Sequence, residues 1–224
     1  MAIHHRAQHL REIGIVRWQK RRLSTSSVSV SGDSNELKAL SDKVRQCQAC
    51  SLHLRRQNTV FGHGSIEADW LFVGEAPGSE EDKQGLPFVG RAGQLLNSML
   101  FSIGLARDEV YITNVLKCRP PGNRDPMGEE VIKCEPYLHK QIDRIKPEII
   151  VAMGRFAAQA LLKSTASIAE LRGQKHEYSD IKIPLVVTYH PAYLLRSLLE
   201  KKKVWKDLQL AQSLFDGFEN ERSV

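Results

Sequence analysis

The sequence predicts an α/β domain in which helices cover both faces of a parallel sheet. From Asn35 onward, short apolar runs alternate with longer segments whose apolar residues recur at helical spacing, as in strands joined by crossover helices. The short runs are apolar at nearly every position, which is typical of strands buried on both faces. With 224 residues, the chain is long enough to bury one substantial core.

Four apolar runs have the length and composition of buried strands. The first run ends at Gly74, and the last ends directly before His190. The four runs are residues 70–73, 110–115, 149–153 and 185–189.

Five segments are predicted to be helical. The first carries Leu37, Leu40 and Val44 at helical spacing and leads into a pair of cysteines. The third contains Pro136, so a break or kink is expected there, because proline cannot donate a backbone hydrogen bond. The segments are residues 37–44, 92–103, 129–145, 156–162 and 191–206, the last continuing to 214 as one or two helices.

The composition is that of a globular protein with a basic balance. The chain is 42% hydrophobic and 26% charged, with a formal net charge of +6 and a pI of about 9.2. No apolar run reaches the roughly 18 residues that a membrane helix needs, so we expect no membrane association. A basic balance favours a polyanionic partner such as DNA or RNA.

The first 34 residues differ from the rest of the chain. They hold six basic residues against two acidic ones, and a Ser/Thr tract spans residues 24–31. This composition fits either a basic, flexible N-terminal arm on a bacterial cytoplasmic protein or a mitochondrial transit peptide. We favour the arm, which gives residues 1–34 as an arm and linker and residues 35–224 as the folded domain.

All four cysteines of the chain fit a single four-thiolate site. Cys47 and Cys50 form a close pair, whereas fifteen residues separate Cys118 from Cys134 far downstream. A zinc ribbon usually has a second close pair. An iron–sulfur cluster tolerates long, uneven spacings because the cluster itself is large. The spacing favours a cluster; a zinc site and unligated buried cysteines remain the alternatives.

Unusual residues follow three of the predicted strands. The loops carry the sequences GEAPGSEED at residues 74–82, TNVLKCRPP at 113–121 and HPAYLLR at 190–196. Because parallel strands place their carboxyl ends at one edge of a sheet, we expect these loops to converge and bind a ligand.

Together with GLPFVGRAGQLL at residues 85–96 and the four cysteines in order, these motifs closely resemble the family 4 uracil-DNA glycosylases. These are the iron–sulfur members of the uracil-DNA glycosylase superfamily, and the resemblance covers residues 35–215. It implies an α/β/α sandwich with a central four-stranded parallel sheet. It also implies a structural [4Fe-4S] cluster on Cys47, Cys50, Cys118 and Cys134, and hydrolytic removal of uracil from DNA as the free base.

The resemblance assigns three side chains to the flipped-out uracil. Phe88 would stack on the ring. Asn114 has an acceptor and donors, so its amide would read N3–H and O4, whereas cytosine presents the reversed pattern and would be rejected. His190 would donate a hydrogen bond to O2 and stabilise the negative charge that develops as the glycosidic bond breaks.

The resemblance also places the Gly74–Glu75–Ala76 backbone beside the uracil, with Glu75 next to C5, where it excludes the methyl group of thymine. The aspartate that activates water in family 1 enzymes falls at Ala76, which cannot act as a base. The catalytic carboxylate therefore stays open, with Glu75 the first candidate and Glu81 the second. The nearby carboxylates are Glu75, Glu80, Glu81 and Asp82.

Leu194 and Leu195 resemble the apolar wedge that fills the space left by a flipped base. Arg119, Arg196 and the basic run at residues 201–203 are candidates for phosphate contacts. The expected partner is uracil-containing DNA, single- or double-stranded, bound by a monomer.

Two other functions remain open at this point. One is a uracil-DNA-binding protein that traps its target without turnover, although the segment after Asn114 lacks the inserted basic loop and histidine of that branch. The other is a zinc-stabilised nucleic-acid module without activity.

Overall fold

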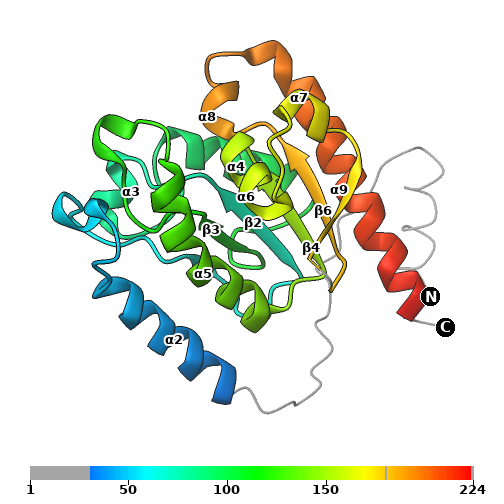
Figure 1. Ribbon diagram of the computed structural model, residues 1–224. Coiled ribbons are helices and arrows are strands. Elements are labelled where there is room, and N and C mark those ends of the chain that lie inside the picture. Colours follow the sequence, from blue (N-terminus) through cyan, green and yellow to red (C-terminus); the bar gives the residue numbers. More distant parts are fainter. Residues whose placement is uncertain (1–30, 180, 223–224) are drawn as a thin grey trace, which may run out of the picture. The chain divides into compact units, whose positions relative to one another are not determined.

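A six-stranded sheet runs through the centre of the computed structural model, which describes residues 31–179 and 181–222 (Figure 1). The strand order is β1-β3-β2-β4-β6-β5, and the four inner strands are parallel. Their bounds confirm the four predicted strands. The strands are β1 (His63–Gly64), β2 (Trp70–Gly74), β3 (Tyr111–Asn114), β4 (Ile149–Met153), β5 (Lys175–Tyr178) and β6 (Ile183–Thr188).

The expected strand number of four is corrected to six, because β1 and β5 add an antiparallel strand at each edge of the sheet. Neither edge strand has the apolar signal of a buried strand. β1 is two residues long, and β5 has the sequence KHEY. The parallel core is therefore as predicted, and its edges are closed by segments that the hydrophobic pattern does not reveal.

Helices cover both faces of the sheet, which confirms the three-layer α/β/α arrangement. One face packs against α2, α5, α6 and α7, and the other packs against α4, α8 and α9. The helices are α2 (Ser31–Arg45), α3 (Ser79–Gln84), α4 (Arg91–Ser102), α5 (Gly128–Ile145), α6 (Arg155–Leu162), α7 (Ile168–Leu171), α8 (Pro191–Leu194) and α9 (Lys201–Arg222). Three 3-10 turns are η1 (Ser51–Leu54), η2 (Pro121–Asn123) and η3 (Leu198–Glu200).

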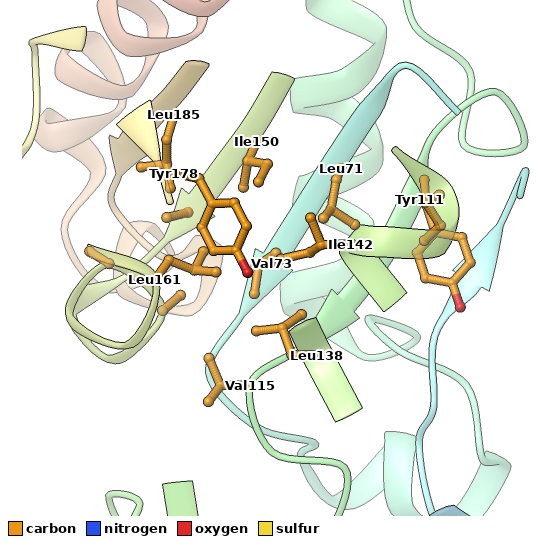
Figure 2. Close-up of a cluster of buried hydrophobic side chains, with 14 of the residues drawn as sticks. Leu71, Val73, Tyr111, Val115, Leu138, Ile142, Ile150, Leu161, Tyr178 and Leu185 are labelled. Atoms are coloured by element: carbon orange, nitrogen blue, oxygen red, sulfur yellow. The ribbon is translucent and has the colours of Figure 1, made fainter. Parts of the chain in front are cut away.

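The alternation along β2 shows how the sequence builds the two cores. Leu71 and Val73 face the cluster beneath α5, where Figure 2 shows them beside Leu138 and Ile142. Trp70 and Phe72 face the opposite cluster, beneath α4 and α9. Side chains on a strand point alternately to opposite faces, so one short apolar run contributes to both layers.

One helix differs from the prediction, and one was not predicted. α5 runs through Pro136 as one continuous helix, so the expected break is absent. The acidic segment after Gly78 forms the short helix α3. The predicted N-terminal arm lies outside the described residues except for residues 31–34, which begin α2. Within the part of the chain that the structure describes, no helix is long and apolar enough to cross a membrane.

A buried ion pair fixes the end of β6. Asp207 of α9 is fully buried, accepts a hydrogen bond from Thr188 Oγ1 at 2.8 Å and pairs with Arg172 Nη2 at 2.7 Å. Arg172 also lies over the ring of Tyr189, 5.3 Å from its centroid. These contacts join α9, the segment after α7 and the last residue of β6. These contacts therefore fix the position of the first residue of the following loop, Tyr189.

Candidate active site

A cleft of about 820 Å³ opens at the carboxyl edge of the parallel strands, where the three predicted loops meet. This position confirms that the loops converge. The predicted site residues that line the cleft are Glu75, Ala76, Glu81, Phe88, Asn114, His190 and Arg196. Several other lining residues were not among the predicted site residues, among them Asn123, Arg124, Asp125, Arg155 and Tyr189.

Asn114 ends β3 directly beside Gly74, the last residue of β2. The Asn114 side chain is 2% exposed, and its Oδ1 atom is buried without a hydrogen-bond partner. A Cβ atom on Gly74 would collide with this oxygen and would lie 2.6 Å from Cζ of Phe88. Gly74 therefore makes room for both side chains. Leaving a buried acceptor unpaired costs about 1–3 kcal/mol, so the site favours a ligand with an N–H group at this point.

His190 lies between β6 and α8, and its ring centroid is 5.5 Å from that of Phe88. The backbone N–H of Ala192 donates to His190 Nδ1 at 3.1 Å. Because Nδ1 accepts, the neutral ring carries its proton on Nε2. The pKa of His190 is lowered to about 4, chiefly by burial; the Glu81 carboxylate opposes this shift and the nearby Arg196 adds to it. At neutral pH the side chain is therefore an uncharged hydrogen-bond donor.

Glu75 is the carboxylate with the most perturbed protonation in the cleft. The pKa of Glu75 is raised to about 7, chiefly by burial and also by the negative charge of Asp125, whereas Arg155 opposes the shift. Arg155 Nη2 pairs with Asp125 Oδ2 at 3.0 Å. A carboxyl group that titrates near neutrality beside a cleft is typical of functional sites. Asp125 and Arg155 lie outside the motifs from which the site was predicted.

The remaining two nearby carboxylates, those of Glu80 and Asp82, do not line the cleft. Asp82 is buried, and its Oδ1 atom accepts hydrogen bonds from the backbone N–H groups of Gln57 and Asn58 at 3.0 and 3.4 Å. Glu80 is exposed and pairs with Lys83 at 2.8 Å. Both side chains therefore have structural partners away from the site.

Leu194 does not fit the predicted role of a DNA wedge. Its side chain is 1% exposed and packs into the core with α4 and α9. Leu195 is half-buried, so its role as a wedge stays a prediction. The next two leucines along the chain, Leu198 and Leu199, are 63% and 92% exposed. Exposed apolar side chains therefore lie downstream of the predicted pair.

The basic residues predicted to contact phosphate lie in different parts of the structure. Arg196 lines the cleft and is exposed, and residues 201–203 are exposed at the start of α9. Arg119 lies outside the cleft wall, and its Nε atom donates to Asn123 Oδ1 at 2.7 Å. Arg119 therefore orients a residue of the cleft rather than facing the cleft itself.

The four cysteines line a second, smaller pocket on the other side of the Asn114 loop. Cys47 follows α2, Cys50 precedes η1, Cys118 follows β3 and Cys134 lies in α5. Three segments that are distant in sequence thus bring every thiol of the chain to one place. Within residues 31–179 and 181–222, no group of three or more His, Cys, Asp or Glu side chains is arranged to hold a single metal ion.

Hydrogen-bond donors surround these thiols. Arg56 Nη1 donates to Cys118 Sγ at 3.3 Å and to the Cys47 carbonyl oxygen at 2.8 Å. The backbone N–H of Lys117 donates to Cys134 Sγ at 3.2 Å. Lys133 also lines the pocket. Donors and cations of this kind stabilise thiolates, which are the ligands of iron–sulfur clusters. The residues therefore fit a negatively charged cluster–thiolate group.

Comparison with known proteins places this chain among DNA glycosylases. The profile of the uracil DNA glycosylase superfamily matches residues 61–209. The chain is 48% identical over 168 residues to a type-4 uracil-DNA glycosylase of Archaeoglobus fulgidus, covering 71% of this chain and 84% of the relative. It is 43% identical over 180 residues to that of Thermotoga maritima, covering 79% and 93%. It is 42% identical over 198 residues to that of Saccharolobus solfataricus, covering 82% and 92%.

The raised pKa of Glu75 predicts a pH-dependent cost to stability. The pKa of about 7 in the folded protein lies above the ordinary value of 4.5, so the contribution of Glu75 to stability is complete below about pH 4.5 and is lost as the pH rises through 7. Glu75→Gln should therefore gain stability relative to the parent between pH 5 and 8, by about 1–2 kcal/mol after allowance for solvent screening. Urea unfolding across this range measures the difference.

Glu67→Gln is the matched control, because Glu67 is exposed; its stability difference from the parent should stay constant with pH. A constant difference for Glu75→Gln as well would contradict the raised pKa.

Proposed function

This chain belongs to the uracil DNA glycosylase superfamily, and we propose that it removes uracil from DNA by hydrolysing the N-glycosidic bond. The products are free uracil and an abasic site, which is the first step of base-excision repair. Three type-4 uracil-DNA glycosylases that cover 71–82% of this chain are 42–48% identical to it. The proposal therefore names a monofunctional glycosylase of the type-4 group.

The observation that carries the proposal is the pairing of one free acceptor with one fixed donor in the same cleft. Asn114 Oδ1 is buried without a partner, and His190 is an Nε2–H donor because its Nδ1 accepts from Ala192. Uracil has an N3–H donor between the O2 and O4 acceptors. Cytosine has an acceptor at N3 and a donor at N4, so it would leave the Asn114 amide unsatisfied.

The mechanism follows from the charge that develops on the leaving base. A base inside a duplex must first be flipped out of the stack, and Phe88 gives the flipped ring a surface on which to stack. As the glycosidic bond breaks, negative charge builds up on the uracil. The low pKa keeps the His190 ring neutral, so it would stabilise that charge as an Nε2–H donor to O2; a neutral imidazole N–H is too weak an acid to give up its proton.

Glu75 is the best candidate for the carboxylate that positions the attacking water. It lines the cleft, whereas Glu80 and Asp82 are engaged elsewhere. Its position at the first residue after β2 also suits the exclusion of the thymine methyl group. Ala76, where family 1 enzymes have an aspartate, lines the cleft but has no group that can act on water.

The four cysteines are proposed to hold a [4Fe-4S] cluster with a structural role. Support comes from their convergence on one pocket and from the donors that face Cys118 and Cys134. Hydrolysis of a glycosidic bond transfers no electrons, so the cluster supplies rigidity to the Asn114 loop rather than redox chemistry. Analysis of iron, sulfide and zinc in the purified protein would distinguish this cluster from a zinc site and from unligated thiols.

The DNA is proposed to lie across the mouth of the cleft. Arg196 is an exposed cation at the cleft, and residues 201–203 carry further exposed basic side chains at the start of α9. We propose that Leu195, with the exposed side chains of Leu198 and Leu199, fills the space left by the flipped base. We propose that the chain acts as a monomer on single- or double-stranded DNA. The proposed location is the bacterial cytoplasm, or the mitochondrion if residues 1–34 are a transit peptide.

Replacing the proposed donor should slow the chemistry without weakening product binding. We expect His190→Ala to lower the single-turnover rate on a single-uracil oligonucleotide by about a hundredfold, as for loss of a donor to a developing anion. Alkali cleavage of the abasic product measures the rate. The affinity for abasic DNA should change little, because the lost hydrogen bond matters chiefly in the transition state.

His63→Ala is the matched control, because His63 is exposed on β1; it should cut at the parent rate. Near-normal rates for both His190→Ala and Asn114→Ala would show that the active site lies elsewhere.

Protein purified without oxygen should contain about four iron and four sulfide per chain. Elemental analysis and the brown colour of the cluster provide the measurement. Cys118→Ser should lose the cluster and the soluble fold together, because the free energy of ligation contributes to folding. Stoichiometric zinc, or intact folding and activity without any metal, would contradict the assignment.

A further inference from the structure

Phe88 has a backbone conformation that a bulky side chain rarely adopts. Its φ angle is +52°, in the left-handed region, where the backbone of a residue other than glycine is strained. The side chain is 6% exposed, and its ring lies beside the imidazole of His190. Such strain persists only where the surroundings enforce it. The structure shows three contacts that enforce it.

The first contact comes from Glu81 on α3. Its Oε1 atom accepts hydrogen bonds from the backbone N–H groups of Val89 and Gly90, both at 2.9 Å. These are the two residues directly after Phe88, and Gly90 is the N-cap of α4. Hydrogen bonds from backbone N–H groups to a carboxylate are stronger than those between neutral groups. The Glu81 carboxylate therefore holds the chain on the C-terminal side of Phe88.

The second contact comes from Arg107, which holds the chain on the N-terminal side. Its Nη2 atom donates to the Pro87 carbonyl oxygen at 2.5 Å, and its Nη1 atom donates to Asn97 Oδ1 at 2.9 Å. Asn97 belongs to α4, so the guanidinium ties the loop to that helix. Pro87 itself has a restricted φ angle, which limits the ways in which the loop can relax.

The third contact is the close packing of the Phe88 carbonyl group against Gly93 in α4. A Cβ atom at Gly93 would collide with the Phe88 carbonyl oxygen. The loop can therefore lie on α4 only because position 93 has no side chain.

We propose that Glu81 is a positioning residue, which together with Arg107 holds Phe88 in the left-handed conformation that aims its ring into the uracil-binding slot. Without this support the backbone would relax to negative φ, and the ring would leave its place beside His190 and the end of β2. Glu81 lines the cleft, but its Oε1 atom is committed to two amides, so it acts through Phe88 and not as the base for water. This inference rests on the proposed function.

A double-mutant cycle between Glu81 and Phe88 tests the proposal. The variants are Glu81→Ala, Glu81→Gln, Phe88→Ala and the combination of Glu81→Ala with Phe88→Ala, assayed by single-turnover excision from a single-uracil oligonucleotide. Glu81→Ala should slow excision roughly tenfold, in line with the loss of one aromatic–base stacking contact. The double variant should be no slower than Phe88→Ala alone, because a residue that acts only through Phe88 has nothing left to position.

Glu81→Gln separates positioning from base catalysis. Its amide oxygen can still accept from both backbone N–H groups, so its rate should lie within about threefold of the parent. A base would be lost equally in the Gln and Ala variants. Glu67→Ala is the control for a change of charge, because Glu67 is exposed; it should cut at the parent rate.

Binding provides a second readout that a general loss of structure would not give. Glu81→Ala should bind non-cleavable 2′-fluoro-deoxyuridine DNA more weakly than the parent but should bind abasic DNA equally well. If Glu81→Ala does not fold, the same cycle with Arg107→Ala carries the same expectation.

Two results would overturn the inference while leaving the proposed function intact. One is a Gln variant as slow as the Ala variant, and the other is a double variant whose defect is the product of the two single defects. A parent chain that does not excise uracil would overturn the inference and the proposed function together.

Discussion

The site depends on the pairing of Gly74 with Asn114 at the ends of β2 and β3. Because position 74 has no side chain, the Asn114 amide and the Phe88 ring can both occupy the space above the strand end. The same register continues past the strands, where Val115 N donates to Gly74 O and Leu116 N donates to Glu75 O, each at 3.0 Å. A larger residue at position 74 would displace the Asn114 amide and the Phe88 ring together.

The cleft and the cysteine pocket are two sides of one loop. Lys117 is fully buried, and its Nζ atom donates to the Asn114 carbonyl oxygen at 2.6 Å and to Gln141 Oε1 at 2.5 Å. Its backbone N–H faces Cys134 Sγ. Cys118 follows directly in sequence. A group bound by the four thiols would therefore fix the loop that presents Asn114, which is the physical basis for a structural rather than a redox role.

Much of this arrangement could be predicted from the sequence, because the central strands are short, uniformly apolar runs that end in glycine, asparagine and histidine motifs. The edge strand β5 was missed because its sequence, KHEY, has no apolar pattern. Leu194 was misassigned because two adjacent leucines do not show which one faces the core. The role proposed for Glu81 could not be predicted from the sequence either, because it depends on the distance between α3 and the backbone of residues 89–90. The perturbed pKa of Glu75 arises from burial and from Asp125, which is distant in sequence.

The proposed chemistry requires a neutral His190 ring whose proton lies on Nε2, because Nδ1 accepts from the Ala192 N–H group. Nitrogen NMR of the protein labelled with ¹⁵N-histidine, assigned by comparison with His190→Ala, measures this protonation state. With the pKa at about 4, the His190 signals should show an unprotonated Nδ1 and a protonated Nε2, unchanged from pH 5 to 8. A His190 ring that gains a second proton within this range, or that carries its single proton on Nδ1, would contradict the account.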